Sequence, residues 1–288
     1  MTEVNLEIFA YYLLGSLFYF LLFLVTTYIA KMKGFLSLPF RRFSGVCATG
    51  SDVFFISLFF ILSFGSTGFF MALFASKSAH PSLLHKILIP LSPFVINIAL
   101  VGVYTWINSK FRLKKLIKDD LYPGKKNIVT DIRDGFVALL LSFPPLFAFI
   151  SALEAFSLWM NTQQATDQDA VAFLMQAKQD PINLFIALIC IVIGSPIIEE
   201  FLFRGVIQSY LRKKAGSIAS IVLTSAFFSL FHFSLGQGIQ NIPIIISLFI
   251  LSLYLGFIYE KTRSLFSPLT LHVTFNLINA IKIIFYSS

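Results

Sequence analysis

Residues 182–205 read INLFIALICIVIGSPIIEEFLFRG, an apolar run long enough to cross a membrane that carries charges in its second part. Two adjacent carboxylates, Glu199 and Glu200, follow seventeen uncharged positions, and Arg204 comes one helical turn later. A charged side chain at the centre of a bilayer costs about 2.5–3.5 kcal/mol on insertion scales. Left unpaired, these three charges would together cost about 8 kcal/mol. We therefore expect them to be paired, hydrated and functional.

The composition is that of a membrane protein. Hydrophobic residues make up 57% of the 288 residues and charged residues 12%, against about 25% charged in an ordinary soluble domain. The mean hydropathy is +0.83. The net charge of +8 is attributed to basic loops at a membrane surface, so the expected partner is the lipid bilayer and not nucleic acid. Cys190 lies in an apolar run, so no disulfide with Cys47 is expected.

The apolar runs predict an all-α, polytopic helical bundle with about eight transmembrane helices. Residues 1–160 are expected to hold four N-terminal spans, and residues 181–285 four more, in one integral membrane unit. The polar stretch 161–180 is expected to be an external loop with a short surface helix. The predicted spans are Ile8–Ala30, Val53–Ala75, Ile87–Ile107, Gly135–Met160, a fifth from Pro181, Ile218–Leu235, Ile244–Tyr259 and Leu265–Phe285.

Lysine and arginine are distributed unevenly over the predicted loops. Of the 22 such residues, 18 fall in the loops after spans one, three, five and seven. The other four are Lys77, Lys86, Lys178 and Lys282. Because basic residues are retained on the cytoplasmic side, this bias predicts that both chain termini lie outside the cytoplasm.

The fifth span is predicted to continue through the glutamates. Residues 201–211 remain largely apolar, and the basic cluster that marks a membrane boundary comes only at Arg212, Lys213 and Lys214. Glu199 then lies about 20 Å from that boundary at 1.5 Å per residue. In a hydrocarbon core about 30 Å thick, this places Glu199 near mid-depth.

Later spans bring further polar residues to a similar depth. His232 is expected about 24 Å from the entry of span six, and His272 and Asn276 about 12 and 18 Å from the entry of span eight. His272 and Asn276 are four residues apart, and so are Glu200 and Arg204, so each pair shares one helical face. All six side chains are therefore predicted to face one wet cavity. Each intramembrane histidine could instead serve only to bond a neighbouring helix, and Glu200–Arg204 could be a purely structural pair.

This inventory predicts hydrolysis. A carboxylate in a partly desolvated site can serve as a general base, and imidazole and amide groups can stabilise an oxyanion. Glu199, His232 and His272 could alternatively bind zinc, because two histidines and a glutamate form a known catalytic zinc set. Two other classes stay open: a proton- or ion-coupled transporter, in which the glutamates relay protons, and a non-catalytic immunity or scaffold protein.

Three motifs in order resemble those of the CAAX prenyl endopeptidase and bacteriocin-processing (CPBP, or Abi) family of intramembrane proteases. Glu199, Glu200 and Arg204 match Glu-Glu-x-x-x-Arg, Phe228 and His232 match Phe-x-x-x-His, and His272 and Asn276 match His-x-x-x-Asn. The resemblance covers about residues 181–285 and contributes no motif to the first four spans.

The resemblance implies a membrane-embedded endopeptidase that hydrolyses a peptide or membrane-protein substrate. By carry-over, Glu199 activates the water, Glu200 and Arg204 orient or assist it, and His232, His272 and Asn276 bind the carbonyl oxygen or the water. Both a metalloprotease and a metal-free glutamate mechanism are held for the family. We favour the second, because Arg204 would repel a cation. Short loops and compact length favour a bacterial plasma membrane, and a prenylated substrate is not assumed.

Overall fold

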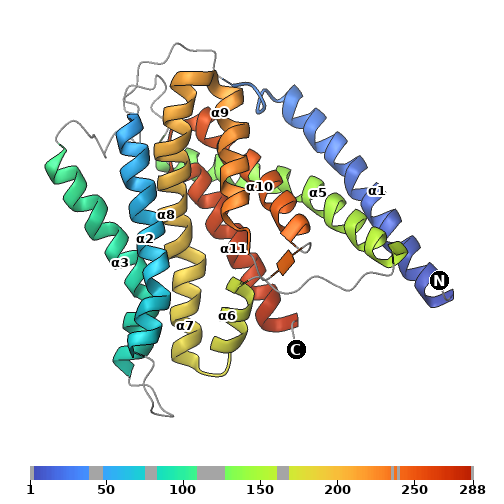
Figure 1. Ribbon diagram of the computed structural model, residues 1–288. Coiled ribbons are helices and arrows are strands. Elements are labelled where there is room, and N and C mark those ends of the chain that lie inside the picture. The colour runs from blue at the N-terminus through green and yellow to red at the C-terminus, as the bar shows by residue number, and fades with distance from the viewer. Residues whose placement is uncertain are drawn as a thin grey trace.

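The computed structural model describes residues 3–38, 48–74, 83–108, 127–160, 169–234, 237–238 and 241–286, and within these ranges the regular structure is helical. Figure 1 shows the helices as a bundle from which two of them project. In chain order, with η for π-helix, they are α1 (Glu3–Met32), α2 (Gly50–Phe74), α3 (Leu83–Ile107), α5 (Ile128–Met160), α6 (Asp169–Ala177), α7 (Pro181–Leu188), η1 (Ile189–Gly194), α8 (Ser195–Glu200), η2 (Phe201–Gln208), α9 (Ser209–Phe231), α10 (Asn241–Thr262) and α11 (Phe266–Tyr286).

Every predicted span has a helical counterpart. Six helices among the described residues are long and apolar enough to cross a membrane, and α2 contributes a shorter apolar helix at Gly50–Gly65. One of the six, Pro181–Phe231, contains two predicted spans. The chain reverses within it at Gly216, whose φ of 81° and ψ of 176° belong to a region that essentially only glycine adopts. The polytopic all-α prediction is thus confirmed.

Gly216 divides the helix Pro181–Phe231 into an ascending arm before it and a descending arm after it. The descending arm is shorter than predicted. α9 ends at Phe231, where Leu235 was expected to close the sixth span. After Gly216 the helix therefore covers about 22 Å at 1.5 Å per residue, which is less than the roughly 30 Å of a hydrocarbon core. The chain consequently leaves helical geometry at His232, inside the thickness of the bundle.

Two π-helical segments interrupt the ascending arm, and Pro196 explains the first. Proline has no N–H and cannot continue the i→i−4 ladder. The N–H of Ser195 instead donates to the carbonyl of Cys190, five residues earlier. In this register Ile191 O would pair with residue 196, which has no hydrogen to donate. The helix continues without a break, but it carries one carbonyl that needs a partner from elsewhere.

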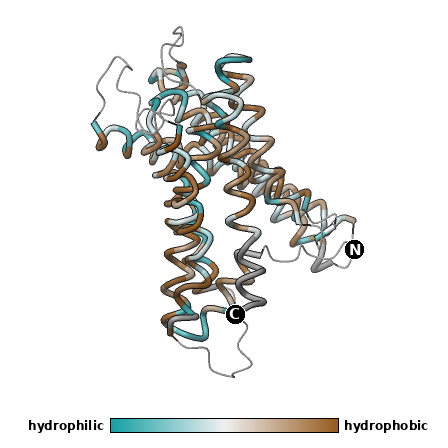
Figure 2. Tube along the Cα trace, turned by 60° about the vertical axis from the view of Figure 1, so that its left-hand side comes forward, coloured by the Kyte–Doolittle hydropathy of each residue, from teal (hydrophilic) through white to brown (hydrophobic). Residues whose placement is uncertain are grey.

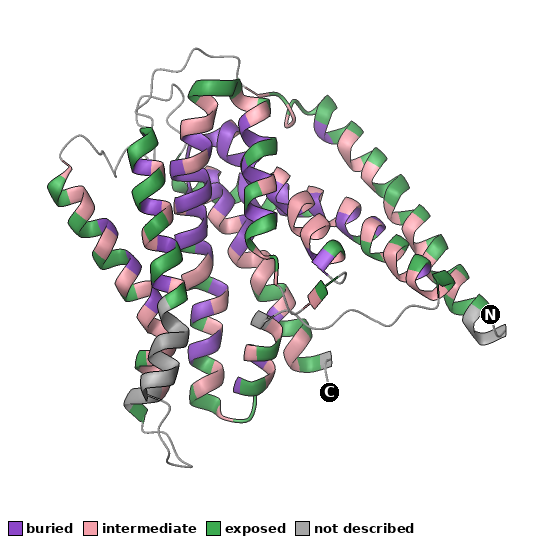
Figure 3. Cartoon of the chain, in the orientation of Figure 1, coloured by how far each residue is buried: buried purple, intermediate pink, exposed green. Residues whose placement is uncertain are grey.

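Three apolar clusters surround this arm. Phe60 of α2 and Val101 of α3 pack with Phe203 and Phe228 of η2 and α9. A second cluster joins α5, α10 and α11, and a third joins α6, α7, η1 and α11. Figure 3 shows the buried residues concentrated on the long ascending arm and the helices next to it. The polar residues of this arm therefore lie at the centre of the bundle.

α1 and α5 extend away from that centre (Figure 1). α1 packs on α5, and α5 in turn contacts α10 and α11. None of the apolar 18-residue window of α1 is buried in the structure, and Figure 2 shows the projecting pair as largely hydrophobic. A helix that is apolar all round and uncovered by protein is expected to face lipid.

The segments that flank the spans pack on the bundle. The short helix expected before the fifth span is present as α6, in which Leu174 is buried against α7, η1 and α11 while Ala172 and Gln176 are exposed. The stretch 161–168 before it lies outside the described residues. Asp131 and Asp134 are both buried in the first turns of α5. Gly135 explains this, since a Cβ there would lie 2.4 Å from Ser267 O; α5 meets α11 closely at this point.

Candidate active site

The two glutamates end α8, in the middle of the ascending arm, and both are buried. Glu199 is 8% exposed and Glu200 is 1% exposed. The helix runs on from them into η2 and α9 and reverses only at Gly216, as predicted from the apolar residues that follow the pair. Successive residues of a helix point about 100° apart, so the two carboxylates meet different neighbours.

Glu200 lies at the centre of the site. Its Oε1 accepts a hydrogen bond from Arg204 Nη1 at 3.0 Å and lies 2.7 Å from His272 Nδ1. A carboxylate oxygen only accepts, so Nδ1 of His272 carries the proton when both groups are in their ordinary charge states. One oxygen thus joins η2 to α11. The predicted Glu200–Arg204 pair is present, and His272 joins it.

Arg204 is fully buried and makes further contacts. Its Nη2 donates to Ser252 Oγ at 2.6 Å and to the Ser252 carbonyl at 3.4 Å, and its guanidinium carbon lies 4.7 Å from the centre of the Phe228 ring. A guanidinium at this distance from an aromatic face is attracted by the ring quadrupole. α10 and α9 therefore fix Arg204 in the orientation in which it meets Glu200.

Glu199 faces a different set of atoms. Its Oε1 accepts from the hydroxyl of Ser195, four residues earlier, and its Oε2 lies 3.9 Å from His272 Nε2. That separation is too long for a hydrogen bond. His272 consequently lies between the two carboxylates, bonded to Glu200 through one ring nitrogen and facing Glu199 with the other.

His232 terminates α9 and is half-buried. Its Nδ1 lies 2.8 Å from the carbonyl of Phe228, which can only accept, so the proton is on Nδ1 and Nε2 is left for other partners. The Phe228 ring lies 4.9 Å from the His232 ring and 5.8 Å from the His272 ring. Phe228 therefore contacts both histidines as well as Arg204.

The side-chain amide of Asn276 hydrogen-bonds the backbone of the ascending arm. Its Nδ2 donates to Ile191 O at 2.9 Å, the carbonyl that Pro196 leaves without a helical partner. Asn276 and His272 lie four residues apart on one face of α11, as expected. One N–H of the Asn276 amide is, however, used to support the π-helical segment η1. Its Oδ1 is the atom left for water or substrate.

Residues 181–278 match the family model described as Type II CAAX prenyl endopeptidase Rce1-like. The matched residues are about a third of the chain and are referred to as the Rce1-like domain. No curated protein and no solved structure matched the chain. The family match confirms the resemblance inferred from the three motifs, and with the apolar helices it makes the chain an integral membrane protein with a domain of a protease family.

The Rce1-like domain contains all six predicted site residues, and the structure adds Ser195 and Ser252. Ser195 could have been found from its spacing, since it precedes Glu199 by four residues on the same helix. Ser252 had no such signal, because its contact with Arg204 spans 48 residues of sequence and depends on how α10 packs. Among the described residues, Glu200 Oε2 and Arg204 Nε are buried without a hydrogen-bond partner. Such atoms are normally satisfied by ordered water.

No three side chains of His, Cys, Asp or Glu converge as a metal-binding group anywhere in the described part of the chain. The set considered for zinc, Glu199, His232 and His272, is therefore not gathered around one point in this arrangement. The geometry does not fit a preformed three-ligand site.

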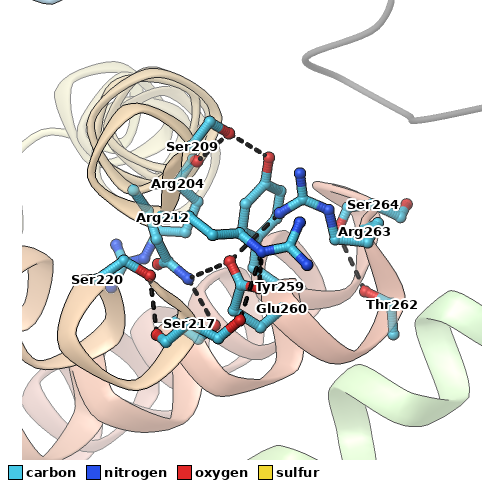
Figure 4. A network of polar contacts seen from close by, with 12 residues as sticks. Arg204, Ser209, Arg212, Ser217, Ser220, Tyr259, Glu260, Thr262, Arg263 and Ser264 are labelled. Atoms are coloured by element: carbon cyan, nitrogen blue, oxygen red, sulfur yellow. Dashed lines mark hydrogen bonds and ion pairs between the residues drawn. The ribbon is translucent and has the colours of Figure 1, made fainter. Parts of the chain in front are cut away.

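A second buried polar cluster lies farther along the same helix face, near Gly216 (Figure 4). Glu260 of α10 is bound by Arg212 Nε at 2.8 Å, by Arg263 Nη1 at 3.2 Å and by Gln208 Nε2 at 3.3 Å. The sequence placed Arg212 and Arg263 among the basic loop residues. They are instead paired inside the Rce1-like domain, and of the basic cluster only Lys213 and Lys214 are exposed.

Proposed function

We propose that this protein is an intramembrane endopeptidase in which Glu199 activates the attacking water. The observation that supports this most directly is the position of His272, 2.7 Å from Glu200 and 3.9 Å from Glu199. The two carboxylates are thereby given different roles. Glu200 bonds Arg204 and His272, while Glu199 Oε2 faces His272 Nε2 without a hydrogen bond.

In the proposed reaction Glu199 takes a proton from water, and the resulting hydroxide attacks the carbonyl carbon of the scissile peptide bond. Nε2 of His272, whose Nδ1 is held by Glu200, and Nε2 of His232 are placed to accept a hydrogen bond from the water, and each donates to the oxyanion when its ring is doubly protonated. Asn276 Oδ1 can accept from the water. Collapse of the tetrahedral intermediate breaks the C–N bond, and the proton held by Glu199 passes to the leaving amine. Water supplies the oxygen of the new carboxylate and the hydrogen of the amine.

No step of this mechanism uses a metal, because the histidines and Glu199 are not gathered as a ligand set and Arg204 places a positive charge at the centre of the site. Elemental analysis of purified, active protein tests this part. Activity without bound metal is the expected result. Zinc at one equivalent per chain, lost together with activity on chelation and restored with it, would replace the glutamate mechanism with a metal-dependent one.

The substrate is proposed to be a peptide or the segment of a membrane protein, cleaved at the depth of Glu199. We place the protein in a bacterial plasma membrane with both termini outside the cytoplasm, since most lysines and arginines belong to the loops assigned to the cytoplasm, even with Arg204, Arg212 and Arg263 left out of the count. Cysteine labelling from the two sides of the membrane, at position 3 and at position 214, tests this orientation.

The decisive experiment compares wild type with Glu199→Gln in proteoliposomes. The probe is an internally quenched peptide with a C-terminal CAAX sequence, supplied farnesylated and unmodified. Loss of a general base lowers the rate by about 10²–10⁴-fold, so Glu199→Gln should be close to inactive on whichever probe the wild type cleaves. Glu154→Gln in α5 is the matched control, because it removes a glutamate that lies outside the site.

Glu199→Gln with wild-type turnover would refute the assignment of the base. If the wild type cleaves neither peptide, the same two variants are compared on membranes from a host lacking the protein, with new peptide termini read by mass spectrometry. The absence of any Glu199-dependent terminus there would refute the peptidase proposal.

A further inference from the structure

The segment directly after His232 is an unusual feature of the bundle. It joins α9 to α10, and Phe233, Ser234, Gln237 and Gly238 are its described residues. Because α9 covers only about 22 Å after its turn at Gly216, this connection begins within the depth of a bilayer core. Non-helical backbone at that depth is tolerated only where its polar groups are satisfied inside the protein.

Asn241, the first residue of α10, satisfies several of these groups with one side chain. Its Oδ1 accepts from Ser234 N at 2.8 Å, while its Nδ2 donates to Ser234 O at 2.7 Å and to Gly238 O at 2.9 Å. Asn241 is 1% exposed. It thus binds both backbone groups of Ser234, the second residue after His232, and holds the connection against the start of α10.

His232 depends on this connection for its position. Its φ of −89° and ψ of 9° are not helical. The N–H groups of His232 and Phe233 still donate to Ser229 O and Leu230 O, each at 3.1 Å, and the next contact that holds the backbone is at Ser234. A displacement of Ser234 would loosen this end of α9 and so the place of the imidazole beside Phe228.

We propose that Asn241 is a positioning residue for His232: it holds the intramembrane connection by three hydrogen bonds and so fixes the imidazole in the site. The inference rests on the proposed function only for its effect on turnover. The effect on the connection and on His232 itself follows from the hydrogen bonds alone.

The test compares Asn241→Ala with wild type, with Asn97→Ala as the matched control. Asn97 is also buried, at 4% exposed, and bridges α3 to Ser63 of α2 through one hydrogen bond at 3.2 Å. Asn241→Ser, whose hydroxyl can keep one of the bonds, serves as a second variant if the alanine variant does not fold. All proteins are purified whole in the same detergent and compared at equal distance below their melting temperatures.

Two measurements do not require activity. Hydrogen exchange of the peptide covering residues 232–241 should become faster in the Asn241 variants, and modification of His232 by diethylpyrocarbonate should accelerate relative to buried His272 in the same molecule. Asn97→Ala should change neither. Unchanged exchange and unchanged His232 modification in the Asn241 variants would overturn the proposal, as would equal changes in Asn97→Ala.

The third measurement is turnover of the peptide that the wild type cleaves. Misplacement of a catalytic group by about 1 Å can cost on the order of 100-fold, so kcat should fall by about 10- to 100-fold while KM changes less than about threefold. Wild-type kcat in Asn241→Ala despite a loosened connection would overturn the positioning role. If the wild type shows no peptidase activity at all, the proposed function fails, and exchange and modification alone decide whether Asn241 fixes His232.

Discussion

Arg204 and Glu200 form an ion pair at 3.0 Å in which the side chains are 0% and 1% exposed. Burial of two charges is expensive, and the cost is recovered only when further hydrogen bonds satisfy both partners. The structure supplies them from separate helices: His272 bonds the same carboxylate oxygen, and Ser252 accepts from the guanidinium. Contacts from α9, α10 and α11 therefore hold the pair in place, so it has a structural role besides any role in catalysis.

Removal of both partners of this pair should destabilise the protein by less than the sum of the two single removals. Arg204→Met leaves a buried carboxylate with only His272, and we expect a loss of about 3–5 kcal/mol in the free energy of unfolding. Glu200→Gln with Arg204→Met removes both charges and should cost less than the sum of the two single changes. A double-mutant cycle measured by denaturant unfolding in mixed micelles gives the coupling. Additive losses would mean that the pair contributes no interaction of its own.

The continuity of the helix through Glu199 and Glu200 could be predicted from the sequence, because the apolar residues extend to Leu211 and the basic cluster begins only at Arg212. The shared face of His272 and Asn276 followed from their spacing. The use of the Asn276 amide did not follow, because Ile191 O becomes available only through the π-register before Pro196.

Contacts between distant segments could not be predicted from the sequence either. Ser252 reaches Arg204 because α10 packs beside η2, and no spacing rule connects residues so far apart. Arg212 and Arg263 looked like loop charges because a sequence shows the charge of a residue but not whether a carboxylate such as Glu260 meets it inside the fold. α6 looked exposed for a similar reason: its apolar residues pack on α11, which lies about a hundred residues later.

The relationship between Asn276 and Pro196 predicts a compensating pair of substitutions. Asn276→Ala leaves Ile191 O without its donor, and an unsatisfied buried carbonyl costs about 1–3 kcal/mol. Pro196→Ala restores an N–H at the position where the ladder lacks one, so the double variant should recover most of the stability lost by Asn276→Ala. Thermal unfolding of the four proteins tests this.

Turnover by the same double variant separates the two roles of Asn276. If Oδ1 accepts a hydrogen bond from the water, activity stays low although stability returns. Recovery of both would assign Asn276 to support of the π-segment alone, and recovery of neither would contradict the explanation given for Ile191.

The cluster around Glu260 predicts a stability effect in which the active site takes no direct part. Glu260→Ala deprives Arg212 and Arg263 of their shared carboxylate inside the protein, and we expect a loss of about 3–5 kcal/mol. Lys213→Ala, an exposed change one residue from Arg212, should alter stability by less than about 0.5 kcal/mol. Unfolding in denaturant compares the two, and a similar small effect of both variants would show that the buried cluster is not stabilising.

The contact between α3 and α7 predicts a dependence of stability on pH. Lys86 Nζ donates to Asp180 Oδ2 at 2.6 Å, and the backbone N–H groups of Asn183 and Ile182 donate to Oδ1. The Lys86 hydrogen bond first, and then the backbone donors, lower the pKa of Asp180 below its ordinary value. A carboxylate with a depressed folded-state pKa stabilises the fold above its unfolded pKa, and this contribution is lost as the pH falls through the folded value. Asp180→Asn should therefore lower the melting temperature at about pH 7 and lose that effect by about pH 2. A difference from wild type that stays constant over this range would show that the charge of Asp180 does not link the two helices.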